Sequence, residues 1–342
     1  MSPLGLITSL LPVVLFLVGL LVMDSYRLVT RGSVARTIAV GMAAALVSLA
    51  LNLAALRLLH VDPVPLKRYL APLHEELLKA AYLVYLIRTD KVGFMVDAGL
   101  RGFALGAGFA LAENLYYVYG VPSAPLMLWV VRGLGTAVLH GSTTAIVGIV
   151  SKAMWDRRET RDWRAFAPGL ILAIAIHSLY NHLLLPPIAE AALLLLGMPV
   201  ILALVFERSD RATREWLGAG LDRDAELLEL VLSGRIADTP VGRYLDAIRR
   251  HFPAAVVADM LCLLQIRLEL SMRAKGILIA RAAGVDLPID RDVRANFEEL
   301  AYLERSIGKT GWLALEPFLR TTKRDLWQIY MLKRGAGGVP RP

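Results

Sequence analysis

The chain has 342 residues, of which 56% are hydrophobic and 20% are charged, and its formal net charge is +8. Up to Phe206 the apolar residues form runs of about 20, the length of a helix that crosses a bilayer, whereas charges recur every few residues from Glu207 onward. This split indicates a polytopic membrane domain over residues 1–206 and a polar domain over residues 207–342.

The positive charge does not indicate nucleic-acid binding. Much of it lies in short loops beside apolar segments, where Lys and Arg set membrane topology and contact anionic lipid. The polar domain interleaves acidic and basic residues. The single cysteine, Cys262, allows no internal disulfide, and its place in the polar domain suits a reducing cytoplasm. The expected partner is therefore a lipid bilayer and not a nucleic acid.

Seven membrane-spanning helices are predicted from the apolar runs, over residues 4–23, 37–59, 69–87, 96–119, 132–150, 168–185 and 188–206. The first run lacks the basic segment and small-residue cleavage site of a signal peptide, so it is predicted to remain as a span. In the polar domain, residues 253–284 begin with Pro, end with Gly and carry apolar residues at helical spacing. Because no long run alternates with a period of two, the predicted fold class is all-α: a membrane helix bundle of about seven spans with a C-terminal helical domain.

Basic residues beside the spans predict the orientation of the chain. They follow the first, third, fifth and seventh spans: Arg27, Arg31 and Arg36; Arg88 and Lys91; Lys152, Arg157, Arg158, Arg161 and Arg164; Arg208, Arg211 and Arg214. The loops around "GVPSAP" and "LLLPP" carry no charge, whereas Lys67 and Arg68 oppose the trend. The positive-inside rule therefore predicts an N-terminus outside the cell and a cytoplasmic polar domain.

Charged residues inside the third and fourth predicted spans need an explanation, because a charge at the bilayer centre costs about 2.5–3.5 kcal/mol. In "EELLK", Glu75 and Lys79 are spaced i, i+4 and share one helix face, which leaves Glu76 without a partner on its own helix. In "FALAENLYY", Glu113 has no basic residue three or four positions away. Both unpaired glutamates must find partners on other helices.

The fifth and sixth spans contain histidines. His140 lies in "HGSTTAIVG", and "HSLYN" places His177 and Asn181 one turn apart on one face. At a rise of about 1.5 Å per residue, Glu75, Glu113 and the two histidines each lie about 9–12 Å from the predicted outer ends of their spans. The shared depth predicts one polar site built by four helices.

Such a site can activate water in two ways. Imidazole and carboxylate groups can bind zinc, which lowers the pKa of a bound water to about 7. Alternatively, a buried glutamate acts directly as the general base, while His177 and Asn181 donate hydrogen bonds to the tetrahedral oxyanion and Lys79 balances the charge of the glutamates. The "HExxH" signature is absent, which excludes the common soluble metalloprotease geometry.

The four segments "EELLK", "FALAE", "HGSTTAIVG" and "HSLYN" resemble, in order, the four motifs of the PrsW family of intramembrane proteases. That family shares a superfamily with the CAAX prenyl endopeptidase and bacteriocin-processing proteins. The resemblance covers about residues 66–185. The prenyl endopeptidase branch carries an arginine one place beyond Lys79 and a histidine in place of Glu113, so this chain favours the PrsW branch.

The resemblance implies a bacterial membrane protease that cuts a membrane-anchored, single-span substrate, with anti-sigma factors as the known substrate class. By position, Glu75 and Glu76 are the predicted water-activating glutamates, with Lys79 beside them. The remaining predicted site residues are Glu113, His140, His177 and Asn181; the first three are the predicted ligands if zinc is used. Asn181 stands where an aspartate would be a better ligand, which favours the route without a metal.

Three other readings are compatible with the polar residues. A proton-coupled transporter also uses membrane carboxylates and histidines, but its internal repeats are not found between the halves of the chain. A relative of the CAAX-type prenyl endopeptidase would share the hydrolytic site. A seven-span scaffold would use the polar residues only to pack helices.

Overall fold

The computed structural model describes residues 3–157, 162–289, 291–319 and 322–335. Within these ranges the regular elements are all helical and no strand occurs, which confirms the predicted all-α class. Two compact units, Met1–Asp210 and Arg211–Pro342, divide the chain, and the division falls inside one long helix, α9 (Pro187–Leu232). Arg158 and Arg161, which were used in the topology prediction, lie outside the described residues.

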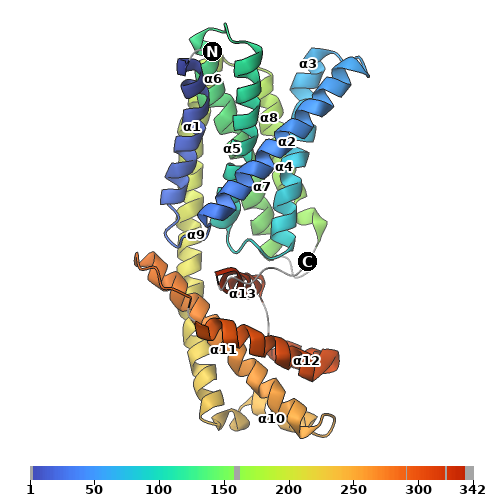
Figure 1. Ribbon diagram of the computed structural model, residues 1–342, viewed down its shortest axis with the longest axis vertical. Coiled ribbons are helices and arrows are strands. Elements are labelled where there is room, and N and C mark those ends of the chain that lie inside the picture. Colours follow the sequence, from blue (N-terminus) through green and yellow to red (C-terminus); the bar gives the residue numbers. More distant parts are fainter. Residues whose placement is uncertain (1–2, 158–161, 290, 320–321, 336–342) are drawn as a thin grey trace. The chain divides into compact units, whose positions relative to one another are not determined.

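The first unit is a bundle of helices (Figure 1). In chain order they are α1 (Pro3–Val22), α2 (Arg31–Arg57), α3 (Pro63–Pro65), η1 (Leu66–Leu70), α4 (Ala71–Arg88), α5 (Met95–Gly120), α6 (Leu126–Val131), η2 (Arg132–Thr136), α7 (Ala137–Arg157), η3 (Trp163–Ala165), α8 (Ala167–Asn181) and the first part of α9. The turns η1 and η2 are π-helical, and η3 is a 3-10 helix.

Among the described residues, six helical stretches are long and apolar enough to cross a membrane: Pro3–Val22, Arg31–Arg57, Met95–Gly120, Leu126–Arg157, Trp163–Asn181 and Pro187–Leu232. The third predicted span, residues 69–87, corresponds to α4, which does not reach that apolar class because it contains Glu75, Glu76, Lys79 and Arg88. The helix α8 ends at Asn181, four residues before the predicted end of its span. The protein is therefore a multi-pass membrane protein in which the motif-bearing helix α4 is unusually polar.

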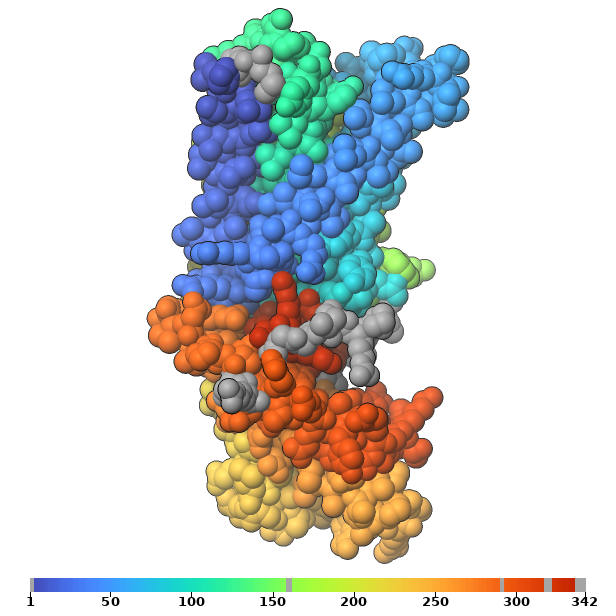
Figure 2. Space-filling view, in the orientation of Figure 1, coloured from blue at the N-terminus to red at the C-terminus, as the bar shows by residue number. Residues whose placement is uncertain are grey.

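The helix α5 is the centre of this unit, because it packs against α7, α2 and α1. Glycines permit the close contact between α5 and α7. A Cβ atom built on Gly106 would lie 2.0 Å from the carbonyl oxygen of His140, and one on Gly102 would lie 2.5 Å from that of Thr144. Small residues of this kind let membrane helices approach backbone to backbone. In Figure 2, α1 and α2, in blue, cover one face of the unit.

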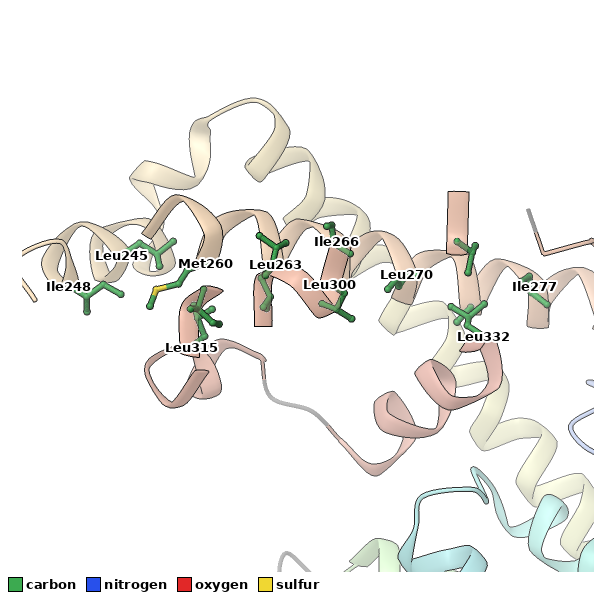
Figure 3. Packing of buried hydrophobic residues seen from close by; sticks show 14 residues of the cluster. Leu245, Ile248, Met260, Leu263, Ile266, Leu270, Ile277, Leu300, Leu315 and Leu332 are labelled. Carbon is green, nitrogen blue, oxygen red and sulfur yellow. The ribbon is translucent and has the colours of Figure 1, made fainter. Parts of the chain in front are cut away.

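The second unit has its own hydrophobic core. It contains η4 (Arg235–Asp238), α10 (Pro240–Ile248), α11 (Ala254–Ala282), α12 (Arg291–Leu319) and α13 (Lys323–Gly335). Figure 3 shows that α10, α11, α12 and α13 contribute to one cluster that includes Leu245, Met260, Leu263, Leu300, Leu315 and Leu332. The helix α12 is kinked at Gly308, whose φ of 63° is outside the helical region.

Candidate functional site

Helix α4 carries the first motif into the interior of the bundle. Glu76 and Lys79 have exposed fractions of 0%, and Glu75 is 7% exposed. The Lys79 ammonium contacts Glu76 at 2.6 Å, so the ion pair is i, i+3 and not the i, i+4 pair of Glu75 and Lys79 that the spacing suggested. Both spacings place side chains on neighbouring helix positions, and other helices around α4 decide between them.

Glu76 is the most heavily bonded carboxylate of the site. Its Oε1 lies 2.6 Å from Lys79 Nζ, 2.8 Å from His177 Nδ1 and 3.1 Å from Thr143 Oγ1. Its Oε2 is buried and has no hydrogen-bond partner among the described residues. The glutamate that lacked a partner on its own helix thus joins α4 to α7 and α8.

His140 is held from both sides of its ring. Its Nδ1 lies 3.3 Å from Lys79 Nζ, and its Nε2 lies 3.0 Å from Glu113 Oε2. An ammonium can only donate and a carboxylate can only accept hydrogen bonds. The contacts therefore assign the ring proton to Nε2, which donates to Glu113, and leave the lone pair of Nδ1 on the side of Lys79.

His177 lies beside His140, with ring centroids 4.9 Å apart and ring planes at 88°. Its Nδ1 contacts Glu76, so its Nε2 faces Glu75 Oε2 at 3.9 Å. Glu75 in turn accepts a hydrogen bond from Ser48 Oγ of α2 at 3.2 Å on Oε1. One ligand atom each from Glu75, His140 and His177 lie within 4.8 Å of one another.

This group of three residues fits a metal ion by its chemistry. Catalytic zinc sites use three protein ligands drawn from imidazole nitrogen and carboxylate oxygen and keep a further position for water. A ligating histidine usually donates its other ring N–H to a carboxylate, and both histidines do so here: His140 to Glu113 and His177 to Glu76. The separations of up to 4.8 Å exceed the roughly 3.4 Å expected between ligand atoms in a tetrahedral zinc site, so the side chains would close by up to about 1.4 Å on binding.

Glu113 occupies a different place from the one suggested by the predicted ligand set. It contacts the far nitrogen of His140 and also Arg132, whose Nη2 lies 3.2 Å from Glu113 Oε1. Glu113 therefore contacts one of the two histidines, whereas the ligand atoms that lie within 4.8 Å of one another come from Glu75, His140 and His177.

Asn181 is not part of the cluster. Its side-chain amide donates to the backbone carbonyl of Lys67 at 2.9 Å, and the neighbouring Ser178 donates to that of Arg68 at 2.6 Å. These carbonyls belong to the π-helical turn η1, which directly precedes α4. Asn181 does lie one helical turn after His177, as the i, i+4 spacing predicts. As the last residue of α8, however, it binds the turn η1 and does not contact the cluster.

Two contributors to the site were not singled out from the sequence. Ser48 carries no sequence signal, since it is one small polar residue in an apolar span. Arg132 carries a signal, because it is a charged residue inside the apolar stretch Leu126–Arg157, but it coincides with the predicted start of a span. Its burial shows that it lies within the bundle.

Residues 30–206, just over half of the chain, match a family described as PrsW family intramembrane metalloprotease. The chain belongs to the PrsW family. No curated protein and no solved structure matches it. Membership makes this PrsW protein an intramembrane peptidase, which sets aside the transporter and scaffold readings. The description of the PrsW family as metalloproteases agrees with the Glu75, His140 and His177 donor set.

Proposed function

We propose that this PrsW-family peptidase hydrolyses a peptide bond in a single-span membrane protein, in the manner of regulated cleavage of an anti-sigma factor. The observation that carries the proposal is the convergence of Glu75, Glu76, Lys79, His140 and His177 from three helices into one buried cluster. Isolated charges are costly in a bilayer, and intramembrane ionisable residues therefore mark functional sites. The proposed substrate is membrane-embedded, because the cluster lies among helices that are long and apolar enough to cross a membrane.

Glu75, His140 and His177 are the residues that would hold the metal ion of this metalloprotease. A bound zinc would lower the pKa of its water to about 7 and polarise the scissile carbonyl. The lone pairs that could bind the ion are on Nδ1 of His140, which Lys79 Nζ contacts at 3.3 Å and would have to release, and on Nε2 of His177, because the opposite nitrogens donate to Glu113 and Glu76. Ser48 holds one oxygen of Glu75 and so directs the other toward His177.

Glu76 is the proposed general base. Lys79, Thr143 and His177 occupy its Oε1, so a proton taken from water goes to Oε2, the buried oxygen without a partner among the described residues. The same oxygen then delivers the proton to the leaving amine, as the two directions of general acid–base catalysis require. Lys79 balances the negative charge that Glu76 carries before it takes the proton and again after it has delivered it.

The proposed orientation places the N-terminus outside the cell and the second unit in the cytoplasm. It is supported by the basic residues that follow alternate spans. The second unit is a helical domain with a hydrophobic core of its own. We propose no separate role for it, because its described residues provide no site from which to argue one.

The test is cleavage of a single-span substrate by purified protein in vesicles, combined with measurement of bound zinc. Glu76→Gln keeps an acceptor oxygen for His177 but cannot take a proton, so we expect retained zinc and a loss of activity of at least about 10²-fold. Glu75→Gln and His177→Ala should lose both zinc and activity. Asp156→Asn is the matched control, because Asp156 pairs with Lys152 at 2.8 Å at the end of α7. Normal cleavage by Glu76→Gln and His177→Ala would contradict the proposal.

A further inference from the structure

Arg132 is a buried cation that joins η2 to the acidic side of the site. We propose that Arg132 is a positioning residue for the peptidase reaction, which acts through Glu113 to fix the ring orientation and tautomer of His140. The inference rests on the proposed role of His140, and it assigns a function to a residue that none of the four motifs contains.

The guanidinium of Arg132 has three different partners. Nη2 lies 3.2 Å from Glu113 Oε1, Nε donates to Asn114 Oδ1 at 2.9 Å, and the guanidinium carbon lies 3.7 Å from the ring centroid of Tyr117. All three partners lie on α5. The contact of Nη2 with Glu113 is an ion pair without the alignment of a hydrogen bond, whereas Nε makes an aligned hydrogen bond to Asn114. A planar guanidinium can combine these two contacts with an aromatic face in one geometry, which the point charge of a lysine cannot. The arrangement therefore specifies arginine and not merely a positive charge.

The π-helical turn η2 brings Arg132 onto the face of His140. In a regular α-helix, residues eight apart differ by about 80° around the axis. A π turn advances by about 4.4 residues per turn, so the five residues Arg132–Thr136 remove roughly 90° from this difference. Arg132 and His140 consequently point in nearly the same direction, and both reach Glu113 on α5. Helical spacing alone would have separated them.

Glu113 connects the two residues through its two oxygens. Oε1 faces Arg132, and Oε2 faces Nε2 of His140 at 3.0 Å. With Arg132 on one oxygen, the other is held as an acceptor for the Nε2 proton, and the lone pair of His140 remains on Nδ1. Outer partners of this kind set which imidazole nitrogen is available to a ligand.

Helix α1 anchors this arrangement from outside the matched family region. The side-chain amide of Asn114 donates to the backbone carbonyl of Ser9 at 2.7 Å, which fixes the orientation of the amide oxygen that Arg132 contacts. The residue after Arg132 is also pressed against α1, because a Cβ atom on Gly133 would lie 2.0 Å from the carbonyl oxygen of Thr8. The family match begins at residue 30, after the end of α1. Helix α1 therefore contributes to the position of Arg132 although it lies outside the matched region.

The test compares Arg132→Met, Arg132→Lys and the matched control Lys152→Met, which removes another buried cation of the same helical stretch. The first readout is the ¹⁵N chemical shifts of the His140 ring, assigned with a His140→Asn variant, in protein freed of metal. We expect an Nε2-protonated ring in the wild type and in Lys152→Met, and a mixture of tautomers in Arg132→Met. This readout needs no activity, so it separates failure of this inference from failure of the proposed function.

The second readout is steady-state cleavage of the single-span substrate. Loss of an outer partner typically costs about 10–100-fold, so kcat should fall by that factor in Arg132→Met while KM stays within about threefold. Arg132→Lys should recover part of kcat. Because Arg132 acts through Glu113, the double variant with Glu113→Gln should lose no more than Glu113→Gln alone.

An unchanged His140 spectrum together with kcat within twofold of wild type would overturn the proposal. Multiplicative losses in the double variant would also overturn it, because they would mean that Arg132 acts independently of Glu113. If Arg132→Met does not fold, the decision falls to Arg132→Lys, which keeps the charge: a wild-type spectrum and kcat would overturn the proposal, and a shifted spectrum with reduced kcat would support it.

Discussion

Replacing Gly106 by alanine should damage catalysis from a position that touches no catalytic side chain. The added Cβ would lie 2.0 Å from the carbonyl oxygen of His140, and real Cβ contacts essentially never fall below 3.0 Å. The obstacle is backbone, so α7 must move away from α5 by at least about 1 Å at His140 itself. A misplacement of about 1 Å can cost 10²-fold in rate, which corresponds to about 2.7 kcal/mol in the barrier.

The assay is cleavage of a single-span substrate in vesicles, with thermal unfolding in detergent measured in parallel. Gly99→Ala is the matched control, since it lies on the same helix and its Cβ would meet only the flexible end of the Ile149 side chain, at 3.1 Å. We expect kcat/KM to fall about 10²-fold for Gly106→Ala and to stay within threefold for Gly99→Ala. Activity of folded Gly106→Ala within threefold of wild type would refute the argument that the α5–α7 contact positions His140.

Three further outcomes are expected. Thr143→Val removes a donor to Glu76 and should lower kcat about tenfold, since a hydrogen bond to a charged group contributes about 1.5–3 kcal/mol. The control Thr144→Val, whose hydroxyl contacts only a backbone carbonyl, should lower kcat less. Equal losses in the two variants would argue against a specific role for Thr143. Asn181→Ala should reduce thermal stability slightly and activity by less than about tenfold, because its amide bonds to the Lys67 carbonyl and not to the cluster; complete loss of activity would restore it to the catalytic group. Removal of metal with a chelator should abolish cleavage and added zinc should restore it, whereas full activity of the metal-free protein would favour direct catalysis by glutamate.

Much of the site could be predicted from the sequence because charged residues in apolar spans are costly and therefore informative. Glu75, Glu76, Lys79, Glu113, His140 and His177 were all selected on this ground, and the structure brings every one of them into a connected set of contacts. The all-α class followed from the same runs of apolar residues, since a helix satisfies its own backbone hydrogen bonds in lipid.

The partners of these residues could not be read from spacing. Helical periodicity predicts an ion pair between Glu75 and Lys79. With α7 and α8 packed against α4, Lys79 instead pairs with Glu76, and Glu75 faces His177. Spacing likewise joins Asn181 to His177, whereas the end of α8 turns its amide to the carbonyl of Lys67.

The amino-acid sequence by itself determined which residues are too polar for lipid and hence that one buried site exists in a helical membrane protein. Only the tertiary structure decided which residues of that site contact one another. It did so through two features that no periodic rule contains: the π-helical turn η2, which rotates Arg132 toward Glu113, and Gly106, which lets α5 reach the backbone of His140. Both depend on contacts between helices distant in the chain, and local spacing describes only one helix at a time.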